Sequence, residues 1–301
     1  MLIRIVSILF PLFAIAALGF FVGRRMRPDL SHANRLNMDV FIPALVIAAL
    51  AGRSVDLVAF LPLAVATLLL VVGCGLTAWL AARLLHIDPR TLVPPMMFNN
   101  CGNLGLPLAV LAFGEDALAP AVVMFMVSNL LHFSFGAWLL DHSVRLRAIW
   151  RIPSVWATFV GLAIGLSGIE VWPPMMMAIR MLGDIAVPLM LFALGVRLTD
   201  SKIGEIRLGL AGAVMRPLLG MAVAWAIMAV IELPARQQAL LLVFGALPPA
   251  VLNYIFAERY HQEPEKVASM VLIGNIASLL FLSIALAVAL PETPSIPGGH
   301  Q

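Results

Sequence analysis

Apolar segments of about 20 residues recur along this sequence, a length that matches an α-helix crossing the hydrocarbon of a bilayer. The 301 residues are 62% hydrophobic and only 12% charged, far from the composition of a soluble domain. Hydrocarbon offers no water to the backbone, and the segments lack the short alternating pattern of barrel strands. The sequence therefore predicts an all-α integral membrane protein.

Charged or Pro/Gly-rich breaks divide the chain into ten predicted spans. Arg24, Arg25 and Arg27 follow the first span, and no small-residue cleavage site is present, so we expect a retained helix and not a signal peptide. The predicted spans are 3–23, 31–51, 59–82, 92–113, 117–140, 153–169, 173–196, 208–231, 237–257 and 264–290.

The lysines and arginines are distributed unevenly between the two sides. Fourteen of the 19 lie in connections after odd-numbered spans, three lie on the other side, and two lie within spans. Because positive charge collects in cytoplasmic loops, we expect the odd connections to be cytoplasmic and both termini to lie outside the plasma (inner) membrane. No basic run indicates nucleic acid.

The sequence contains little that indicates a metal site or an enzyme active site. Cys74 and Cys101 both lie in apolar segments, where small residues serve helix contacts, so neither a disulfide framework nor a four-ligand zinc site is expected. The chain also lacks a metal-ligand cluster, a nucleophile-base spacing and a phosphate-binding loop. We therefore expect no enzyme activity and no cofactor.

The second half of the chain resembles the first at an offset of 145. This offset places Pro28, Arg35, Asp39, Pro43 and Ala48 on Pro173, Arg180, Asp184, Pro188 and Ala193. Each half, 1–145 and 150–292, holds five spans, so the second copy enters the membrane with opposite orientation. Inverted repeats of this kind are typical of secondary transporters.

Several charges are predicted within or beside the spans. Asp39 lies near the start of the second span, and Arg180 and Asp184 near the outer start of the seventh, where they form either an interfacial ion pair or a coupling-ion site. Arg216 lies about 12 Å into the eighth span, so it must snorkel, pair with an acid or face an aqueous path. An anion-attracting role is one hypothesis for Arg216.

Two spans at equivalent repeat positions are interrupted. The span 92–113 contains "FNNCGNLGLPL", and the span 237–257 contains Pro248 and Pro249, residues that free or break a helical backbone. Paired broken helices mark the binding site of a transporter, because their positive N-terminal ends hold an anion near mid-membrane. The predicted substrate-binding residues are Asn99, Asn100, Gly102, Asn103, Gly105, Pro107, Pro248, Pro249, Asn253, Asn129 and Asn275.

Other interpretations of these residues remain open. Kinks are common in membrane helices, and asparagines also join helices. Asn129 and Asn275, at matching repeat positions, either complete the site or brace the broken backbone. His132, one turn from Asn129, is either a hydrogen-bonded packing residue or a proton carrier.

Two of these stretches resemble a known family. "NNCGNLGLPL" and "ALPPAVLNYIFAERYHQEPEKVASMVLIGN" (246–275) are similar to the crossover motifs of the auxin efflux carrier family, in its short bacterial form related to plant PIN-type carriers. The resemblance implies crossing broken fourth and ninth helices, as in bile-acid symporters and NhaA. It also implies a scaffold (1–57 and 150–200), an elevator-like transport domain (58–145 and 201–292), a homodimer joined through the scaffold and a substrate contact at Asn100.

These observations predict a secondary transporter that exports or exchanges small organic anions, either mono- or dicarboxylates, of auxin-like or malate/malonate-like type. The third span has no acidic residue of the kind seen in plant relatives, so the driving ion is left open. One alternative is a sodium-coupled symporter of the bile-acid type. Another is an anion sensor that does not transport.

Overall fold

The computed structural model describes residues 1–51, 58–143, 150–200 and 204–290. The regular elements formed by these residues are helices, so the all-α prediction is confirmed. The predicted domain boundaries at 57, 145, 201 and 292 lie outside the described residues. So do four of the counted cations: Arg53, Arg145, Arg147 and Lys202.

Seven of the ten predicted spans correspond to uninterrupted helical segments that are long and apolar enough to cross a membrane. These seven are α1 (Leu2–Met26), Ser31–Leu50, α4 (Leu61–Leu85), Glu115–Leu140, α10 (Pro173–Asp200), α11 (Ile206–Met228) and α14 (Pro264–Ala289). Ser31–Leu50 comprises α2 (Ser31–Leu36), the π-helical turn η1 (Asn37–Phe41) and α3 (Ile42–Leu50). Glu115–Leu140 comprises the 3-10 turn η4 (Glu115–Ala117), α7 (Leu118–Leu131), the π-helical turn η5 (His132–Gly136) and α8 (Ala137–Leu140).

The other three predicted spans are shorter or broken. The span 153–169 is α9 (Pro153–Ser167). The span 92–113 consists of α5 (Pro89–Met97) and a helix from Cys101 to Phe113, formed by the π-helical turn η3 (Cys101–Gly105) and α6 (Leu106–Phe113). The span 237–257 consists of α12 (Ala235–Ala246) and α13 (Val251–Arg259). Both predicted interruptions are therefore present.

The long helices expose many large apolar side chains, as expected for surfaces in contact with lipid. Phe10 and Phe21 on α1 are 69% and 67% exposed, and Leu84 on α4 is 79% exposed. A water-soluble protein would bury most such side chains. The exposed apolar surface and the seven long apolar helices together indicate a multi-pass membrane protein.

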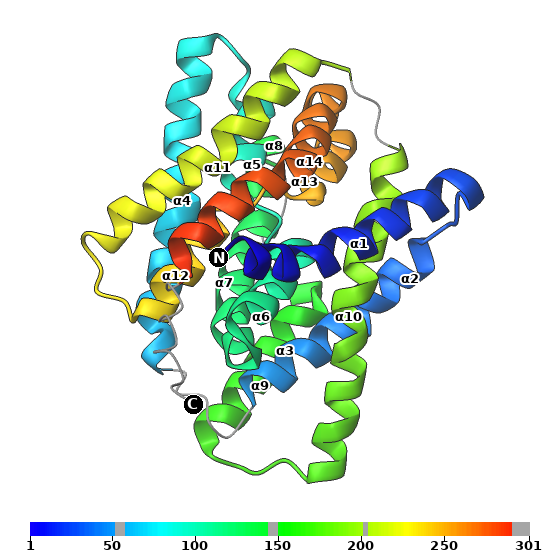
Figure 1. Ribbon diagram of the computed structural model, residues 1–301, viewed down its shortest axis with the longest axis vertical. Coiled ribbons are helices and arrows are strands. Elements are labelled where there is room, and N and C mark those ends of the chain that lie inside the picture. Colours follow the sequence, from blue (N-terminus) through cyan, green and yellow to red (C-terminus); the bar gives the residue numbers. More distant parts are fainter. Residues whose placement is uncertain (52–57, 144–149, 201–203, 291–301) are drawn as a thin grey trace, which may run out of the picture.

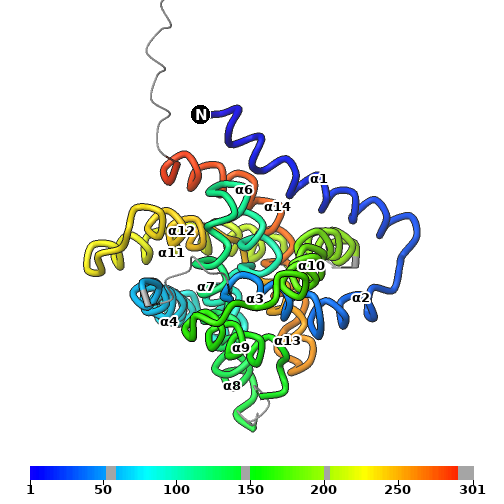
Figure 2. The backbone as a smooth tube through the Cα atoms, turned by 90° about the horizontal axis from the view of Figure 1, so that it is seen from below, coloured from blue at the N-terminus to red at the C-terminus, as the bar shows by residue number. Residues whose placement is uncertain are grey.

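The helices pack in two groups (Figures 1 and 2). In one, α1 lies along α10, and α3 packs against both α9 and α10. The other contains α4, α5, α7 and α11 to α14. Close approach of α1 to α10 depends on two glycines, since a Cβ on Gly19 would lie 2.1 Å from the Phe192 carbonyl oxygen and one on Gly195 would lie 1.9 Å from that of Ala16.

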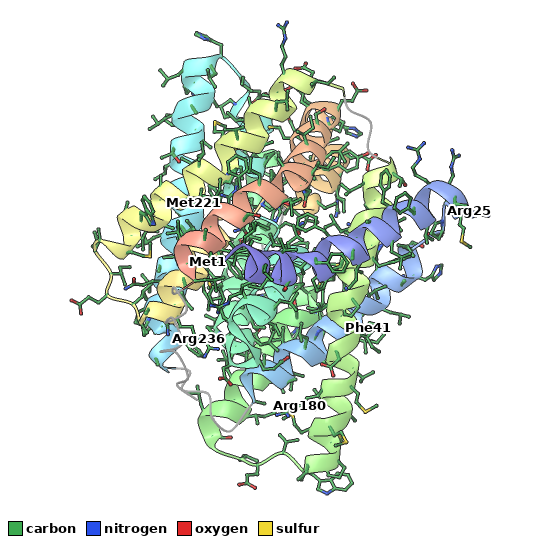
Figure 3. All side chains as sticks on the ribbon, viewed as in Figure 1. Met1, Arg25, Phe41, Arg180, Met221 and Arg236 are labelled. Carbon is green, nitrogen blue, oxygen red and sulfur yellow. The ribbon has the colours of Figure 1, made fainter. Side chains whose placement is uncertain are left out.

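Connections that the distribution of lysines and arginines assigns to the same side of the membrane lie at the same end of the molecule. In Figure 1 the α4–α5 connection and the start of α11 lie at one end, and the α9–α10 connection lies at the other. Figure 3 likewise places Arg25, at the end of α1, and Arg180, on α10, toward different ends.

Candidate functional site

The two broken segments pair with each other near the centre of the molecule. Phe98–Asn100 and Leu247–Ala250 leave the helical conformation and run antiparallel, with a bridge between Asn99 and Pro249. The Asn100 N–H donates to the Pro248 carbonyl at 2.8 Å, and the Ala250 N–H donates to the Phe98 carbonyl at 3.0 Å. Pro248 and Pro249 have no N–H to continue α12, which explains where that helix ends.

Only a short part of the polar stretch "FNNCGNLGLPL" is non-helical. From Cys101 the chain is helical again, first as the π-helical turn η3 and then as α6. Gly105 and Pro107 are thus within a helix and buried, and a Cβ on Gly105 would lie 2.9 Å from the Leu247 side chain. Gly105 therefore packs against the second broken segment, and neither Gly105 nor Pro107 lines the cavity described below.

Asparagine amides donate further hydrogen bonds to backbone carbonyls at the two helix breaks. Asn99 Nδ2 donates to the Phe244 carbonyl in the last turn of α12 at 2.6 Å. Reciprocally, Asn253 Nδ2 on α13 donates to the Phe98 carbonyl at 2.9 Å. The last carbonyls of a helix lack helical partners, and in a membrane each unpaired one is costly. The two amides therefore support the backbone of the opposite segment.

Asn100 and Asn275 form a second buried link between the halves. Asn100 Nδ2 donates to Asn275 Oδ1 at 2.9 Å, and Asn275 Nδ2 donates to the Pro249 carbonyl at 3.1 Å. The exposed fractions of the two side chains are 3% and 4%. Of the two roles left open for Asn275, the geometry favours bracing of the broken backbone.

A cavity of about 340 Å³ lies beside the paired segments, where the two packing groups meet. Asn103 and Asn129 contribute half-buried amides to its wall, and neither makes a hydrogen bond within the described part of the chain. The predicted site residues in its lining are Asn99, Asn100, Gly102, Asn103, Asn129, His132 and Asp39. Those outside the lining are Gly105, Pro107, Pro248, Pro249, Asn253, Asn275, Arg216, Arg180 and Asp184.

Two helix N-termini face this cavity. The helix Cys101–Phe113 begins at Cys101, and α13 begins at Val251, and both first residues belong to the lining. A helix N-terminus carries about half a positive charge on its free N–H groups. The cavity wall is therefore polarised in the sense that favours an anion.

Each of the three π-helical turns in the described residues reaches the cavity. Asn37 in η1, Gly102 in η3 and His132 in η5 all line it. Turns of this kind are rare in proteins overall. Those that do occur often lie at functional sites, because the extra residue redirects neighbouring side chains. The sequence analysis did not anticipate them, since a π turn leaves no clear periodic signature.

Several polar lining residues were missed by the sequence analysis. Arg197, in the last turns of α10, and Arg151, before α9, were counted only as orientation signals. Asn34 and Asn37 lie within "SHANRLNMD", the stretch that carries the repeated Arg-Asp motif. Two asparagines about one turn apart beside that motif were the available signal.

His132 is buried within an aromatic cluster. Its ring stacks on Phe98 with a centroid distance of 4.1 Å and an interplanar angle of 5°, and it meets the edge of Phe256 at 5.2 Å. The side chain is 5% exposed. This arrangement supports a packing role for His132, in which the ring fixes the position of Phe98 at the helix break, but the buried Nε2 has no hydrogen-bond partner among the described residues.

The predicted ion pairs differ between the halves. Arg35 and Asp39 lie 3.7 Å apart with both side chains largely exposed, whereas Arg180 and Asp184 form no ion pair with each other. Arg216 is buried and donates from Nη1 to the Gly245 carbonyl at 3.1 Å. Snorkelling, pairing with an acid and facing an aqueous path were the three possibilities considered from the sequence. None of them describes Arg216, because its hydrogen bond goes to the backbone of a broken helix.

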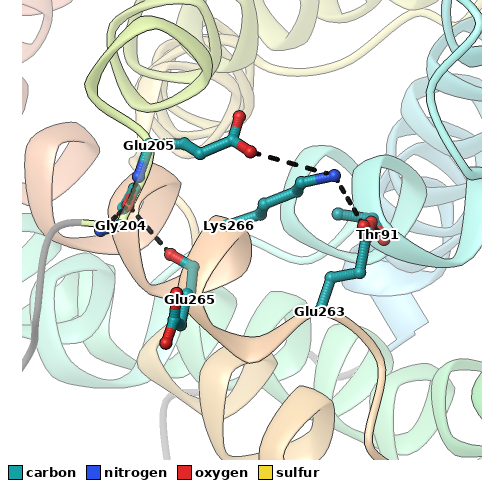
Figure 4. Close-up of polar contacts among 7 residues, drawn as sticks. Thr91, Gly204, Glu205, Glu263, Glu265 and Lys266 are labelled. Carbon is teal, nitrogen blue, oxygen red and sulfur yellow. Dashed lines mark hydrogen bonds and ion pairs between the residues drawn. The ribbon is translucent and has the colours of Figure 1, made fainter.

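At one end of the molecule, a polar cluster joins residues at the ends of α5, α11 and α14 (Figure 4). Glu263, just before α14, accepts hydrogen bonds from Lys266 Nζ and Thr91 Oγ1, each at 2.5 Å. These bonds, first that of Lys266 and then that of Thr91, lower the pKa of the Glu263 carboxyl. Glu205, before α11, lies 4.0 Å from Lys266. The cluster ties α5, α11 and α14 together at one end.

Comparison with known proteins identifies the family. A family model described as membrane transport protein matches residues 4–145 and 135–286. This chain belongs to that family, the auxin efflux carriers. The resemblance drawn from the two crossover motifs is thereby confirmed, and membership indicates a transport role and not catalysis.

Three relatives illustrate the range of similarity. A Rhizobium meliloti (strain 1021) protein named "putative malonate transporter" is 28% identical over 199 residues, which cover 60% of this chain and 61% of that protein. An uncharacterized transporter of Methanocaldococcus jannaschii is 24% identical over 277 residues, covering 84% and 88%. An uncharacterized transporter of Escherichia coli (strain K12) is 23% identical over 287 residues, covering 87% and 90%.

Proposed function

We propose that this protein is a secondary transporter of small organic carboxylates, which it exports or exchanges across the inner membrane. The observation that carries the proposal is the cavity beside the paired broken segments. It offers two helix N-termini, the half-buried amides of Asn103 and Asn129, and the cationic side chains of Arg151 and Arg197. Amides and helix N-termini hold a carboxylate, and a guanidinium binds a second one.

The substrate we favour is a dicarboxylate of malonate size. One carboxylate would lie at the N-termini of the helices that begin at Cys101 and Val251, and the other would lie toward Arg197. The cavity of about 340 Å³ falls at the small end of ligand pockets, which span about 300 to 1,000 Å³. A relative named for malonate supports this choice.

For the mechanism we propose alternating access between two inverted five-helix repeats. The group containing α1, α3, α9 and α10 would be the scaffold (1–57 and 150–200) and would join two copies in a homodimer. The remaining helices would be the moving transport domain (58–145 and 201–292). The location of the cavity at the contact between the groups supports this division, since sliding of one group would carry a bound anion.

Counterflow in proteoliposomes tests the proposed function. Vesicles loaded with unlabelled malonate should take up labelled malonate faster than protein-free vesicles. Asn129→Leu should slow this uptake, because it removes a lining amide that bonds to no backbone carbonyl of the described residues. Absence of counterflow for malonate and for a panel of mono- and dicarboxylates would refute the proposal.

A further inference from the structure

Arg216 is the largest fully buried side chain in the described residues, with an exposed fraction of 1%. It lies in the middle of α11, and no carboxylate of the described residues is within ion-pair distance of it. The ionisable groups near it are the thiols of Cys74 and Cys101. A buried guanidinium without an acidic partner is costly, so its surroundings must offset the charge in another way.

The C-terminal end of α12 supplies part of that compensation, while the buried Nε of Arg216 has no hydrogen-bond partner among the described residues. Arg216 Nη1 donates to the carbonyl of Gly245, one residue before α12 ends at Ala246. The final carbonyls of a helix lack helical partners and carry the negative end of its dipole. The preceding carbonyl, that of Phe244, accepts the amide of Asn99, a residue that lines the cavity. The guanidinium thus lies immediately behind the candidate substrate site.

The backbone around Arg216 is shaped to admit this contact. A Cβ on Gly220, one turn further along α11, would lie 2.0 Å from the Gly245 oxygen and 2.3 Å from Arg216 Nη1. A Cβ on Gly245 would lie 2.6 Å from the Gly220 oxygen. The two glycines therefore bring α11 and α12 into backbone contact, which places the guanidinium against the end of the broken helix.

We propose that Arg216 is a fixed cation of the crossover, and that it replaces a bound coupling ion. In carriers with broken helices, backbone carbonyls at the C-terminal ends of the half-helices coordinate Na⁺. Here the guanidinium occupies such an end, neutralises the negative pole of α12 and keeps that pole from repelling an anion in the cavity. Transport then needs neither Na⁺ nor K⁺. This inference rests on the proposed function.

Chemical rescue distinguishes the charge of Arg216 from its volume. Arg216→Ala should lose malonate counterflow, and low millimolar guanidinium chloride should restore it. Urea, which has nearly the same shape without the charge, should not. Arg207→Ala is the matched control, since Arg207 is an exposed arginine on the same helix, and neither additive should change its rate. Wild-type counterflow should be equal in sodium, potassium and choline media.

Two results would overturn the inference: equal rescue by urea and guanidinium, or a requirement of the wild-type protein for Na⁺ or K⁺. Thermal unfolding in detergent provides a second measurement that needs no substrate. The melting temperature of Arg216→Ala should fall and should recover with guanidinium but not with urea at matched ionic strength. If wild-type protein moves no carboxylate, the proposed function fails, while recovery of the melting temperature still decides whether a cation is required behind α12.

Discussion

Replacement of Asn275 by leucine tests the brace between the two halves. Leucine is close in size to asparagine but cannot hydrogen-bond, so Asn100 Nδ2 and the Pro249 carbonyl would both lose a partner. Each buried polar group left unpaired costs about 1 to 3 kcal/mol. The bond from Asn275 to the Val271 carbonyl, within its own helix, adds little. We expect Asn275→Leu to reduce the free energy of unfolding by about 2 to 4 kcal/mol.

Unfolding of purified protein by SDS in mixed micelles would measure this loss. Asn129→Leu is the matched control, because Asn129 occupies a similar place on α7 but makes no hydrogen bond within the described residues. It should cost less than about 1 kcal/mol, within the range of substitutions that break no buried network. Equal destabilisation by the two variants would refute the bracing role and would assign both asparagines the same task.

Two further predictions concern packing and pH. Gly220→Ala should destabilise the protein strongly, because the added Cβ would meet the Gly245 backbone. Gly102→Ala should destabilise it only mildly, since the nearest neighbour of the added Cβ would be the flexible Phe125 ring at 3.1 Å. Thermal unfolding compares the two variants. The lowered pKa of Glu263 stabilises the fold above the unfolded-state pKa, and the stabilisation is lost as pH falls through the folded-state pKa. Glu263→Gln should therefore flatten the loss of melting temperature between neutral and acidic pH, and an unchanged slope would contradict this.

Much of the framework could be predicted from the sequence because the bilayer imposes simple rules. Span length and hydrophobicity follow from bilayer thickness, and Pro248 and Pro249 lack the N–H groups that would continue α12. The pairing of the two interruptions was expected from their equivalent repeat positions. The structure adds that they join through backbone hydrogen bonds, such as that between Asn100 and Pro248.

The direction in which each amide points could not be predicted. Asn99 and Asn253 belong to polar clusters that suggest ligand contact, yet both amides donate to carbonyls of the opposite segment. Choosing between a ligand and a backbone partner requires the relative placement of residues about 150 positions apart, which spacing along one helix does not contain. For the same reason Arg197 was missed, because α10 reaches the cavity only through tertiary packing.

The central claim is that the cavity beside the paired broken segments binds the transported carboxylate, and Cys101 offers a direct test. The chain has two cysteines, and Cys101 lines the cavity while Cys74 is fully buried elsewhere. In a Cys74→Ser variant, the rate of Cys101 modification by methyl methanethiosulfonate, a small neutral reagent, can be followed by mass spectrometry. Malonate should slow the reaction and uncharged malonamide should not. A rate that malonate leaves unchanged, in protein that performs malonate counterflow, would contradict the account.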